Sequence, residues 1–188
     1  EGGTADLGRQ LRAFLALRSG RPDPNALHVV YGGGNDVLAL LGAAGADGEV
    51  RAHGAALALA RIVDAMAAAG AVHLLVPNLP DVGLAPAVHL QGPAARAEAR
   101  RLTLAFNAAL QPALAAVERR HGIEIVRLDV FALADRLITD PAAAGFHDVV
   151  TPCQGGAYEG FLFWDLVHPT SAAHARLGAA ALAALLDD

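Results

Sequence analysis

Three short apolar segments constrain the fold of this chain more than any other feature of its sequence. They are "ALHVVYGGG" at residues 26–34, "AVHLLVPN" at 71–78 and "IEIVRLDV" at 123–130. Each is apolar and contains β-branched residues, and the first ends in glycines, which is typical of a buried strand that stops abruptly. Longer segments with helical periodicity separate them, and we expect helices at residues 4–18, 54–69, 94–121, 131–138 and 171–186. Strands and helices that alternate in this way predict an α/β fold with a parallel sheet and helices on both faces.

The predicted sheet is narrow for such a fold. Doubly wound domains usually have about five strands, and only three are recognisable here. The sequence also does not begin with Met. We therefore expect residues 1–188 to form a single domain that lacks one or more N-terminal strands, and we expect the exposed sheet edge to favour self-association between copies.

The composition excludes several classes of function. The chain has 188 residues, a net charge of −5 and 54% hydrophobic residues, which is enough for a real core but gives no basic surface for nucleic acid. All 14 basic residues are arginine, so a P-loop lysine and Schiff-base chemistry are excluded. The single cysteine, Cys153, has no metal-ligand spacing to any histidine, and we expect no metal and no cofactor. No run of 18 apolar residues and no signal peptide is present, so no membrane span is expected.

The segment "GGGND" at residues 32–36 follows the first predicted strand, at the end of the sheet where ligands bind in such folds. A dinucleotide-binding fingerprint would need a third glycine where Val37 stands. A turn from strand to helix, with Asn35 or Asp36 as the helix cap, fits better. That interpretation does not explain three successive glycines, whose usual reason is a close approach of the backbone to another group.

Polar residues also follow the other two strands. Asn78 and Asp81 come after the second strand and are candidates for lining a substrate pocket, although turn chemistry explains them equally well. Asp129 after the third strand is expected to cap the short helix that follows. His28 and His73 lie inside strand segments, and we expect both to be satisfied core residues.

The segment "FLFWDLVHPT" at residues 161–170 places Asp165 three positions before His168. A histidine that acts as a general base needs one ring nitrogen held by an acceptor and the other directed at a nucleophile, and Asp165 can supply the acceptor. Alternatively, Asp165 or Thr170 simply caps a helix and His168 is an exposed loop residue. Either way, Pro169 is expected at the first position of the last helix, and Trp164 is expected to pack against the turn.

The two segments together resemble the GDSL/SGNH hydrolases, and in particular the bacterial GDSL esterases that include autotransporter passenger domains. The likeness runs along the whole chain. "EGGTAD" is similar to the end of the family's second sequence block, "GGGND" to the third and "FWDLVHPT" to the fifth. The segments "LLVPNLPDVGLAP" and "FNAAL" between them are also similar to that subgroup.

This resemblance implies a three-layer α/β/α fold and the hydrolysis of carboxylic esters through a serine acyl-enzyme, as in a serine esterase or lipase. His168 then corresponds to the general base and Asp165 to the residue that orients it. The Asn35 amide and the Gly3 backbone N–H correspond to the donors of the oxyanion hole, and Gly34 lies beside them. The substrate would be a small-molecule or lipid ester, and the protein would be a bacterial one that is secreted or associated with the outer membrane.

The sequence departs from the family at the nucleophile, because no Gly-Asp-Ser segment occurs. The two serines are Ser19, in a polar loop, and Ser171, after the "HPT" segment, and neither fits the role. Cys153 is expected to be an unpaired structural thiol. We therefore expect this chain to have little or no esterase activity alone. Two alternatives remain: a non-catalytic descendant that binds carbohydrate or acyl groups, and an acyltransferase of the same fold.

Overall fold

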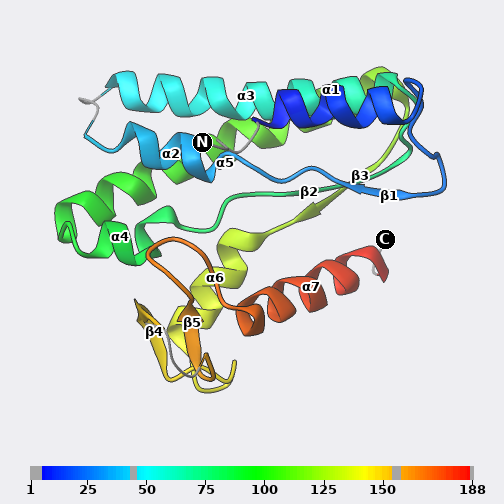
Figure 1. The fold of residues 1–188 in the computed structure, drawn as a ribbon. Coiled ribbons are helices and arrows are strands. Elements are labelled where there is room, and N and C mark those ends of the chain that lie inside the picture. The colour runs from blue at the N-terminus through cyan, green and yellow to red at the C-terminus, as the bar shows by residue number, and fades with distance from the viewer. Residues whose placement is uncertain (1–5, 43–45, 154–157, 187–188) are drawn as a thin grey trace.

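A three-stranded parallel sheet lies between two layers of helices in the computed structural model, which describes residues 6–42, 46–153 and 158–186 (Figure 1). The strands are β1 (Leu27–Val29), β2 (His73–Pro77) and β3 (Ile125–Leu128), in the order β1-β2-β3. Val29 is aligned with Leu75, and Leu75 in turn with Val126, so the three strands run in the same direction. The α/β fold with a parallel sheet that the sequence predicts is confirmed.

The helices divide between the two faces of the sheet (Figure 1). On one side lie α1 (Leu7–Leu17), α3 (Ala46–Ala68) and α5 (Pro93–His121), and on the other lie α6 (Val130–Thr139) and α7 (Ser171–Leu186). Three short elements follow the strands: α2 (Gly34–Leu40), the 3-10 helix η1 (Val82–Leu84) and α4 (Pro86–His89). Gly122, with a φ of 64°, ends α5 in the left-handed conformation that glycine tolerates.

The central strand β2 is buried on both faces, which explains its unbroken apolar sequence. Leu74 and Val76 belong to the core beneath α3 and α5, where Phe106 is fully buried. Leu75 faces the opposite way, into the cluster that α7 covers. Burial of side chains of this size contributes about 1.5–3 kcal/mol each, so these two clusters fix the helices on the sheet.

The structure corrects the predicted boundaries in three places. The helix expected at 54–69 begins earlier, at Ala46. The segment after β2 contains η1 and α4, because Pro86 stands at the start of α4, where its missing N–H is not needed. The segment 139–160, expected to be a loop, contains β4 (Asp148–Pro152), which pairs in parallel with β5 (Phe161–Phe163). Strands this short carry too few residues for a periodic pattern.

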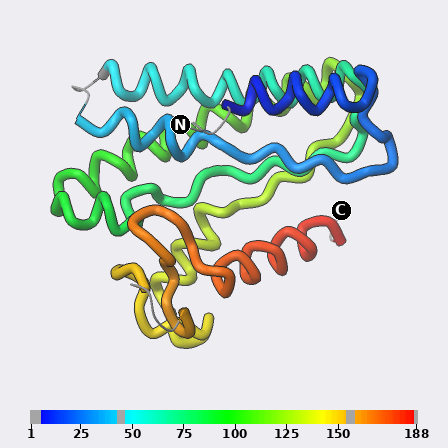
Figure 2. The backbone as a smooth tube through the Cα atoms, viewed as in Figure 1, coloured from blue at the N-terminus to red at the C-terminus, as the bar shows by residue number. Residues whose placement is uncertain are grey.

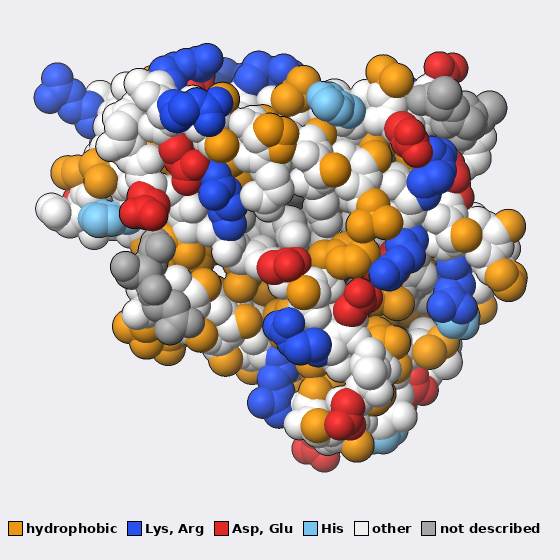
Figure 3. All heavy atoms as spheres, turned by 180° about the vertical axis from the view of Figure 1, so that it is seen from behind, with side chains coloured by type: hydrophobic (Ala, Val, Ile, Leu, Met, Phe, Trp, Pro, Cys, Tyr) orange, Lys and Arg blue, Asp and Glu red, His pale blue; other side chains and the backbone are white. Residues whose placement is uncertain are grey.

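The strand β1 forms one edge of the described sheet, and its apolar side chains are poorly covered. Leu27 is 44% exposed and Val29 57% exposed. Hydrophobic side chains also gather on the outer surface of α7, where Leu182 and Leu186 are exposed (Figure 3). His73 in β2 is exposed, so its prediction as a core residue is wrong, whereas His28 is half-buried and its Nε2 donates to the Asp23 carbonyl oxygen at 2.9 Å. Among the described helices, none has the length and apolar character needed to cross a membrane.

Candidate active site

The turn that carries His168 lies at the end of the sheet where β1 and β2 finish. In Figure 2 this segment, drawn in orange, passes beside the short helix α4. The contact is a backbone hydrogen bond, in which the Ala87 N–H donates to the Leu166 carbonyl oxygen at 2.9 Å. The helix α2, which follows β1, begins at the same end of the sheet (Figure 1). The two segments that resemble the family therefore lie on the side of the sheet where parallel α/β folds bind ligands.

Residues 164–168 form a closed turn at the end of β5. Phe163 pairs with Pro169 in an antiparallel bridge, and the Trp164 N–H donates to the His168 carbonyl oxygen at 2.8 Å. The Thr170 N–H donates to the Leu162 carbonyl oxygen at 2.9 Å, which ties the returning chain to β5. These backbone bonds hold both ends of the turn, so the position of His168 is fixed by its immediate sequence neighbours.

The last helix spans the predicted residues, Ser171–Leu186. It begins at Ser171, and the Thr170 Oγ1 accepts a hydrogen bond from the Ala173 N–H at 3.3 Å. Thr170 is therefore the cap, as one of the two interpretations of this segment held, and it is 2% exposed. Pro169 lies before the cap, in the bridge to Phe163, and not at the first helical position.

Asp165 binds three donors within its own turn. Its Oδ1 accepts from the backbone N–H groups of Val167 at 2.8 Å and His168 at 2.6 Å. Its Oδ2 lies 2.7 Å from the His168 Nδ1. Because an ionised carboxylate can only accept, the proton between them belongs to Nδ1, and the neutral imidazole then has its lone pair on Nε2. This is the tautomer that a general base requires.

The hydrogen bonds keep Asp165 ionised. The backbone N–H of His168, then that of Val167 and then the His168 side chain lower the pKa of Asp165 from 3.8 to about 2. The His168 side chain is 71% exposed, and its Nε2 has no hydrogen-bond partner among the described residues. Asp165 and His168 thus form an oriented pair whose outer nitrogen is open for a further group.

The structure explains two of the three glycines in "GGGND". A Cβ at Gly32 would overlap the Leu7 side chain of α1. Gly33 has a φ of 110°, and a Cβ there would overlap the Phe106 ring. At Gly34 neither reason holds, since a Cβ would meet no heavy atom within 4 Å among the described residues. Close packing therefore requires the first two glycines, and the space beside the third is open.

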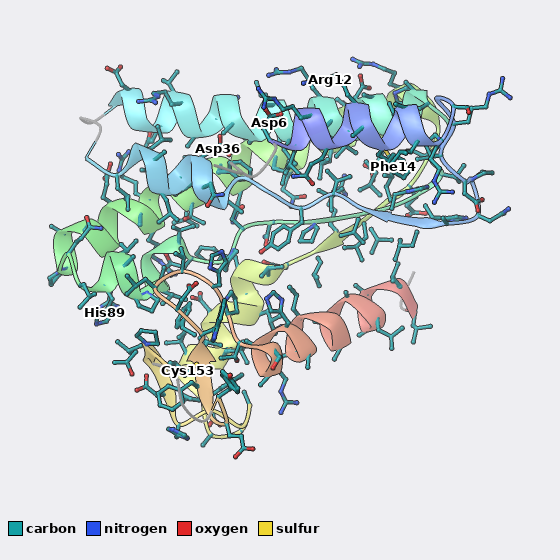
Figure 4. The ribbon with its side chains drawn as sticks, in the orientation of Figure 1. Asp6, Arg12, Phe14, Asp36, His89 and Cys153 are labelled. Carbon is teal, nitrogen blue, oxygen red and sulfur yellow. The ribbon has the colours of Figure 1, made fainter. Side chains whose placement is uncertain are left out.

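Asn35 lies in the first turn of α2 and is exposed. Its side chain makes no hydrogen bond with the part of the chain that the structure describes. The cap position of α2 is occupied by Gly33, so the predicted capping by Asn35 or Asp36 is wrong; Asp36 lies in the first turn of the helix (Figure 4). Gly3 lies outside the described residues, so the second oxyanion donor stays a prediction, as does the role of Asn35.

The polar residues at the ends of β2 and β3 are engaged with each other. The Asn78 side chain donates to the Asp129 Oδ1 at 2.9 Å and accepts from the Phe131 N–H at 3.0 Å. Asp129 caps α6, as predicted, by accepting from the Ala132 N–H at 3.0 Å. Asn78 therefore connects two strand ends, and its prediction as a pocket residue has no support from these bonds.

Asp81 is 6% exposed and holds a structural position. Its Oδ2 accepts from Arg100 at 2.6 Å and its Oδ1 from the Gly83 N–H at 2.9 Å. Arg100 also binds Asp135, with the shorter contact at 3.3 Å. These three side chains line a hollow of about 390 Å³ between η1, α5 and α6, and neither Asn35 nor His168 lines it.

One buried polar residue that positions the site region was missed from the sequence. Asn107 on α5 accepts from the Leu79 N–H at 2.9 Å and donates to the Leu79 carbonyl oxygen at 2.8 Å. This pair of bonds fixes the chain directly after β2. Asn107 follows Phe106 and precedes Leu110 on the buried stripe of the helix, and a polar residue on such a stripe signals a buried hydrogen-bond partner.

Neither serine makes a side-chain hydrogen bond to His168 in the described part of the chain. Ser19 is an exposed turn residue with a φ of 52° that precedes β1, at the opposite end of the strand from "GGGND". Ser171 is exposed at the start of α7 and makes no side-chain hydrogen bond to His168. Cys153 is a buried free thiol, 3.6 Å from the Trp164 carbonyl oxygen. Within residues 6–42, 46–153 and 158–186, no three His, Cys, Asp or Glu side chains are grouped to hold a metal ion.

Comparison with known proteins identifies the family. The sequence model of the GDSL-like lipases/acylhydrolases matches residues 2–181. An uncharacterized protein from the trpE-trpG intergenic region of Pseudomonas putida is 31% identical over 173 residues, which cover 81% of this chain and 27% of that protein. Lipase 1 of Photorhabdus luminescens is 39% identical over 79 residues, covering 42% of this chain and 12% of that protein. A GDSL esterase/lipase of Arabidopsis thaliana is 24% identical over 137 residues, covering 63% of this chain and 38% of that protein.

These relatives are much longer than the chain, which spans between 12% and 38% of their lengths. The family match, in contrast, covers nearly all of the chain and includes both segments described above. The fold has the parallel sheet and flanking helices of this family. The chain belongs to the GDSL-like lipase/acylhydrolase family of ester hydrolases.

Proposed function

We propose that this chain carries the base and part of the oxyanion hole of a serine esterase that works through an acyl-enzyme. His168 takes the proton of a serine hydroxyl as it attacks the acyl carbonyl, and later passes the proton to the leaving alcohol. Asp165 holds the imidazole in the required tautomer and stabilises it when it is charged. The Asn35 amide and the Gly3 N–H donate to the oxyanion that forms on the carbonyl oxygen.

The observation that supports this proposal most strongly is the geometry of the pair. The distance from the Asp165 Oδ2 to the His168 Nδ1 is 2.7 Å, and the low pKa of Asp165 makes Nδ1 the protonated nitrogen. A cap alone would need only the two backbone bonds to Oδ1. The third hydrogen bond, between the Asp165 Oδ2 and the His168 Nδ1, leaves Nε2 open. A general base needs this arrangement, whereas a helix cap does not.

The nucleophile belongs to a segment outside the 188 residues in this proposal. Ser19 precedes β1, at the end of the strand away from Gly34, and Ser171 makes no side-chain hydrogen bond to His168. The exposed Asn35 amide, which has no hydrogen-bond partner among the described residues, also fits a site that is completed by another segment. The chain alone should accordingly have little or no esterase activity.

The test is the turnover of p-nitrophenyl butyrate by the purified 188-residue chain. We expect a rate no greater than that of the His168→Ala variant prepared in the same way. Robust turnover that His168→Ala abolishes would show that the chain contains its own nucleophile, and the proposal of an external serine would be wrong.

The upstream coding sequence separates this proposal from a non-catalytic binding module. A Gly-Asp-Ser segment there supports the esterase, and its absence from an otherwise complete gene supports a descendant that binds acyl groups or carbohydrate. Hydrolysis and acyl transfer share the same acyl-enzyme. An added alcohol acceptor distinguishes them by whether a new ester appears beside the free acid.

We also propose that the exposed edge of β1 leads copies of this isolated chain to associate, because Leu27 and Val29 are exposed on a strand that has a strand partner on one side alone among the described residues. Sedimentation that shows a single monomeric species over a wide concentration range would contradict this. We further propose a secreted or outer-membrane-associated location in a bacterium, which fractionation of the producing cells would test.

A further inference from the structure

The proposed base and the proposed oxyanion donor stand on separate structural units. Asn35 lies in α2, which follows β1 of the three-stranded sheet. His168 lies in the turn that follows β5, and β5 pairs with β4 in a sheet of their own. Among the described residues no strand pairing joins the two sheets. The separation between Asn35 and His168 therefore depends on contacts other than strand pairing.

The short helix α4 makes one such contact, with the turn that carries His168. The first N–H groups of a helix have no acceptor inside the helix, and the Ala87 N–H, at the second position of α4, is one of them. It donates to the carbonyl oxygen of Leu166, which lies between Asp165 and His168 in sequence, at 2.9 Å. Among the described residues this is the only hydrogen bond between residues 164–168 and the part of the chain before β4.

The same helix also packs towards α2. Val88 of α4 is fully buried and forms an apolar cluster with Ala85, which precedes α4, and Ala99 of α5. Leu38 and Leu41, at the end of α2, pack against this cluster. Figure 1 shows α4 beside both α2 and the loop that follows β5. The helix thus contacts both units, through a backbone hydrogen bond to one and an apolar cluster shared with the other.

We propose that α4 is the positioning element of the active site, in which Ala87 holds the turn of His168 and Val88 holds the helix against α2. The proposal rests on the proposed esterase function, because it concerns the separation of the proposed base from the proposed oxyanion donor. Reacting groups must be held in a narrow range of geometry, and a displacement of about 1 Å can lower the rate about 10²-fold. Ala87 and Val88 are positioning residues, since both act through the elements that they contact.

Ala87→Pro tests the hydrogen bond, because proline has no N–H to donate. In the longer protein that supplies the serine, this variant should lower kcat for p-nitrophenyl butyrate about 10²-fold and leave KM nearly unchanged. Ala94→Pro is the matched control. Pro93 and Ala94 occupy the first two positions of α5 as Pro86 and Ala87 do in α4, and the Ala94 N–H donates to no acceptor among the described residues. Equal kcat values in the two variants would overturn the proposal.

Val88→Ala tests the packing side, and it also serves if Ala87→Pro does not fold. The control is Val63→Ala, because Val63 is equally buried but belongs to the core beneath α3. Both variants leave a cavity of the same kind and should lower the melting temperature. Only Val88→Ala should also lower kcat, by about tenfold, because it alone loosens α4. If both variants kept the full kcat, Val88 would contribute stability alone.

A measurement on the 188-residue chain needs no nucleophile and so stands apart from activity. A spin label is placed on α2 through Ala39→Cys, an exposed position, in a Cys153→Ala background. Its paramagnetic broadening of the His168 backbone amide in NMR spectra reports the separation of α2 from the turn. We expect Ala87→Pro to change this broadening and Ala94→Pro to leave it as it is.

The carboxyl chemical shift of Asp165 should be the same in both proline variants, because its three hydrogen bonds lie within the turn. Identical broadening in Ala87→Pro and Ala94→Pro would overturn the positioning role of α4, whatever the activity. Altered broadening in Ala87→Pro, together with a longer protein that has no esterase activity, would overturn the proposed function and leave α4 as the element that sets the separation.

Discussion

The two sides of the candidate site are built in opposite ways. On one side, Asp165 makes three hydrogen bonds within four residues, and the backbone of the same turn closes around them. On the other side, Asn35 lies in the first turn of the short helix α2, where its side chain is exposed and has no hydrogen-bond partner among the described residues. His168, the proposed base, is thus oriented by its own sequence neighbours, whereas Asn35, the proposed oxyanion donor, follows two glycines that close packing against Leu7 and Phe106 requires.

The difference shows which polar residues are available for chemistry. Asn78 and Asp81 stand at equally suggestive positions in the sequence, but every bond they make has a structural purpose. The Asn35 amide and the His168 Nε2 lie at the same end of the sheet, and neither has a hydrogen-bond partner within residues 6–42, 46–153 and 158–186. The catalytic candidates are therefore distinguished by polar groups without a described hydrogen-bond partner, and not by their position after a strand alone.

Removal of the base is expected to have the largest effect. In the longer protein that supplies the serine, His168→Ala should lower kcat for p-nitrophenyl butyrate by about 10²–10⁴, the usual contribution of a general base. The melting temperature should not change, because the side chain is 71% exposed. His174→Ala, which alters an exposed histidine on α7, is the control and should retain full activity. An equal loss in both variants would contradict the role of His168.

The amide side should be less sensitive. Asn35→Ala should lower kcat by about 10²–10³, as expected when one oxyanion donor is lost, and should leave KM nearly unchanged. Asn25→Ala, at another exposed asparagine outside the site, is the matched control. If Asn35→Ala changed the stability of the protein but not kcat, Asn35 would not belong to the same active site as Asp165 and His168.

A third variant separates structural from catalytic polar residues. Asn107→Leu leaves the Leu79 N–H and carbonyl oxygen without partners in a buried place, and should lower the free energy of unfolding by about 1–3 kcal/mol. Gln111→Leu, on an exposed position of the same helix, should change it little. Urea denaturation of this chain measures both, and equal stability of the two variants would show that the Asn107 bonds contribute nothing.

The smallest effect concerns the pH dependence of the turn. Because the pKa of Asp165 is lowered from 3.8 to about 2, its ionised form is the one that stabilises the folded state. That stabilisation is fully present above about pH 4 and is lost as the pH falls towards 2. Carboxyl chemical shifts from NMR should place the midpoint for Asp165 well below that of the same residue in the urea-unfolded chain. Coincident midpoints would mean that the turn does not hold the carboxylate.

Much of the fold could be predicted because its signals are local. The apolar runs at β1, β2 and β3 and the cap at Asp129 depend on residues next to them in sequence. The Asp165–His168 pair belongs to the same class, since three residues of spacing suffice to form it. The features that could not be predicted depend on residues that are distant in sequence. Gly32 is required by its packing against Leu7 on α1, and Gly33 by its packing against Phe106 on α5.

The exposure of Trp164 could not be predicted for a related reason. An aromatic residue beside a catalytic turn is normally expected to be buried, and its neighbour Phe163 is indeed only 7% exposed. Leu162 and Phe163 are both buried in one apolar cluster, and β5 pairs with β4, a strand that the sequence did not reveal. Neither that pairing nor the closure of the turn, which holds the Trp164 backbone, can be inferred from residues 161–170 alone.

The central claim is that this chain holds an oriented base without its own nucleophile. A fluorophosphonate, which reacts covalently with activated serines, tests it directly when the modified peptides of the 188-residue chain are identified by mass spectrometry. The account predicts no His168-dependent modification of Ser19 or Ser171, and His168-dependent modification of another serine in the longer protein. Stoichiometric labelling of Ser19 or Ser171 that His168→Ala abolishes would contradict it.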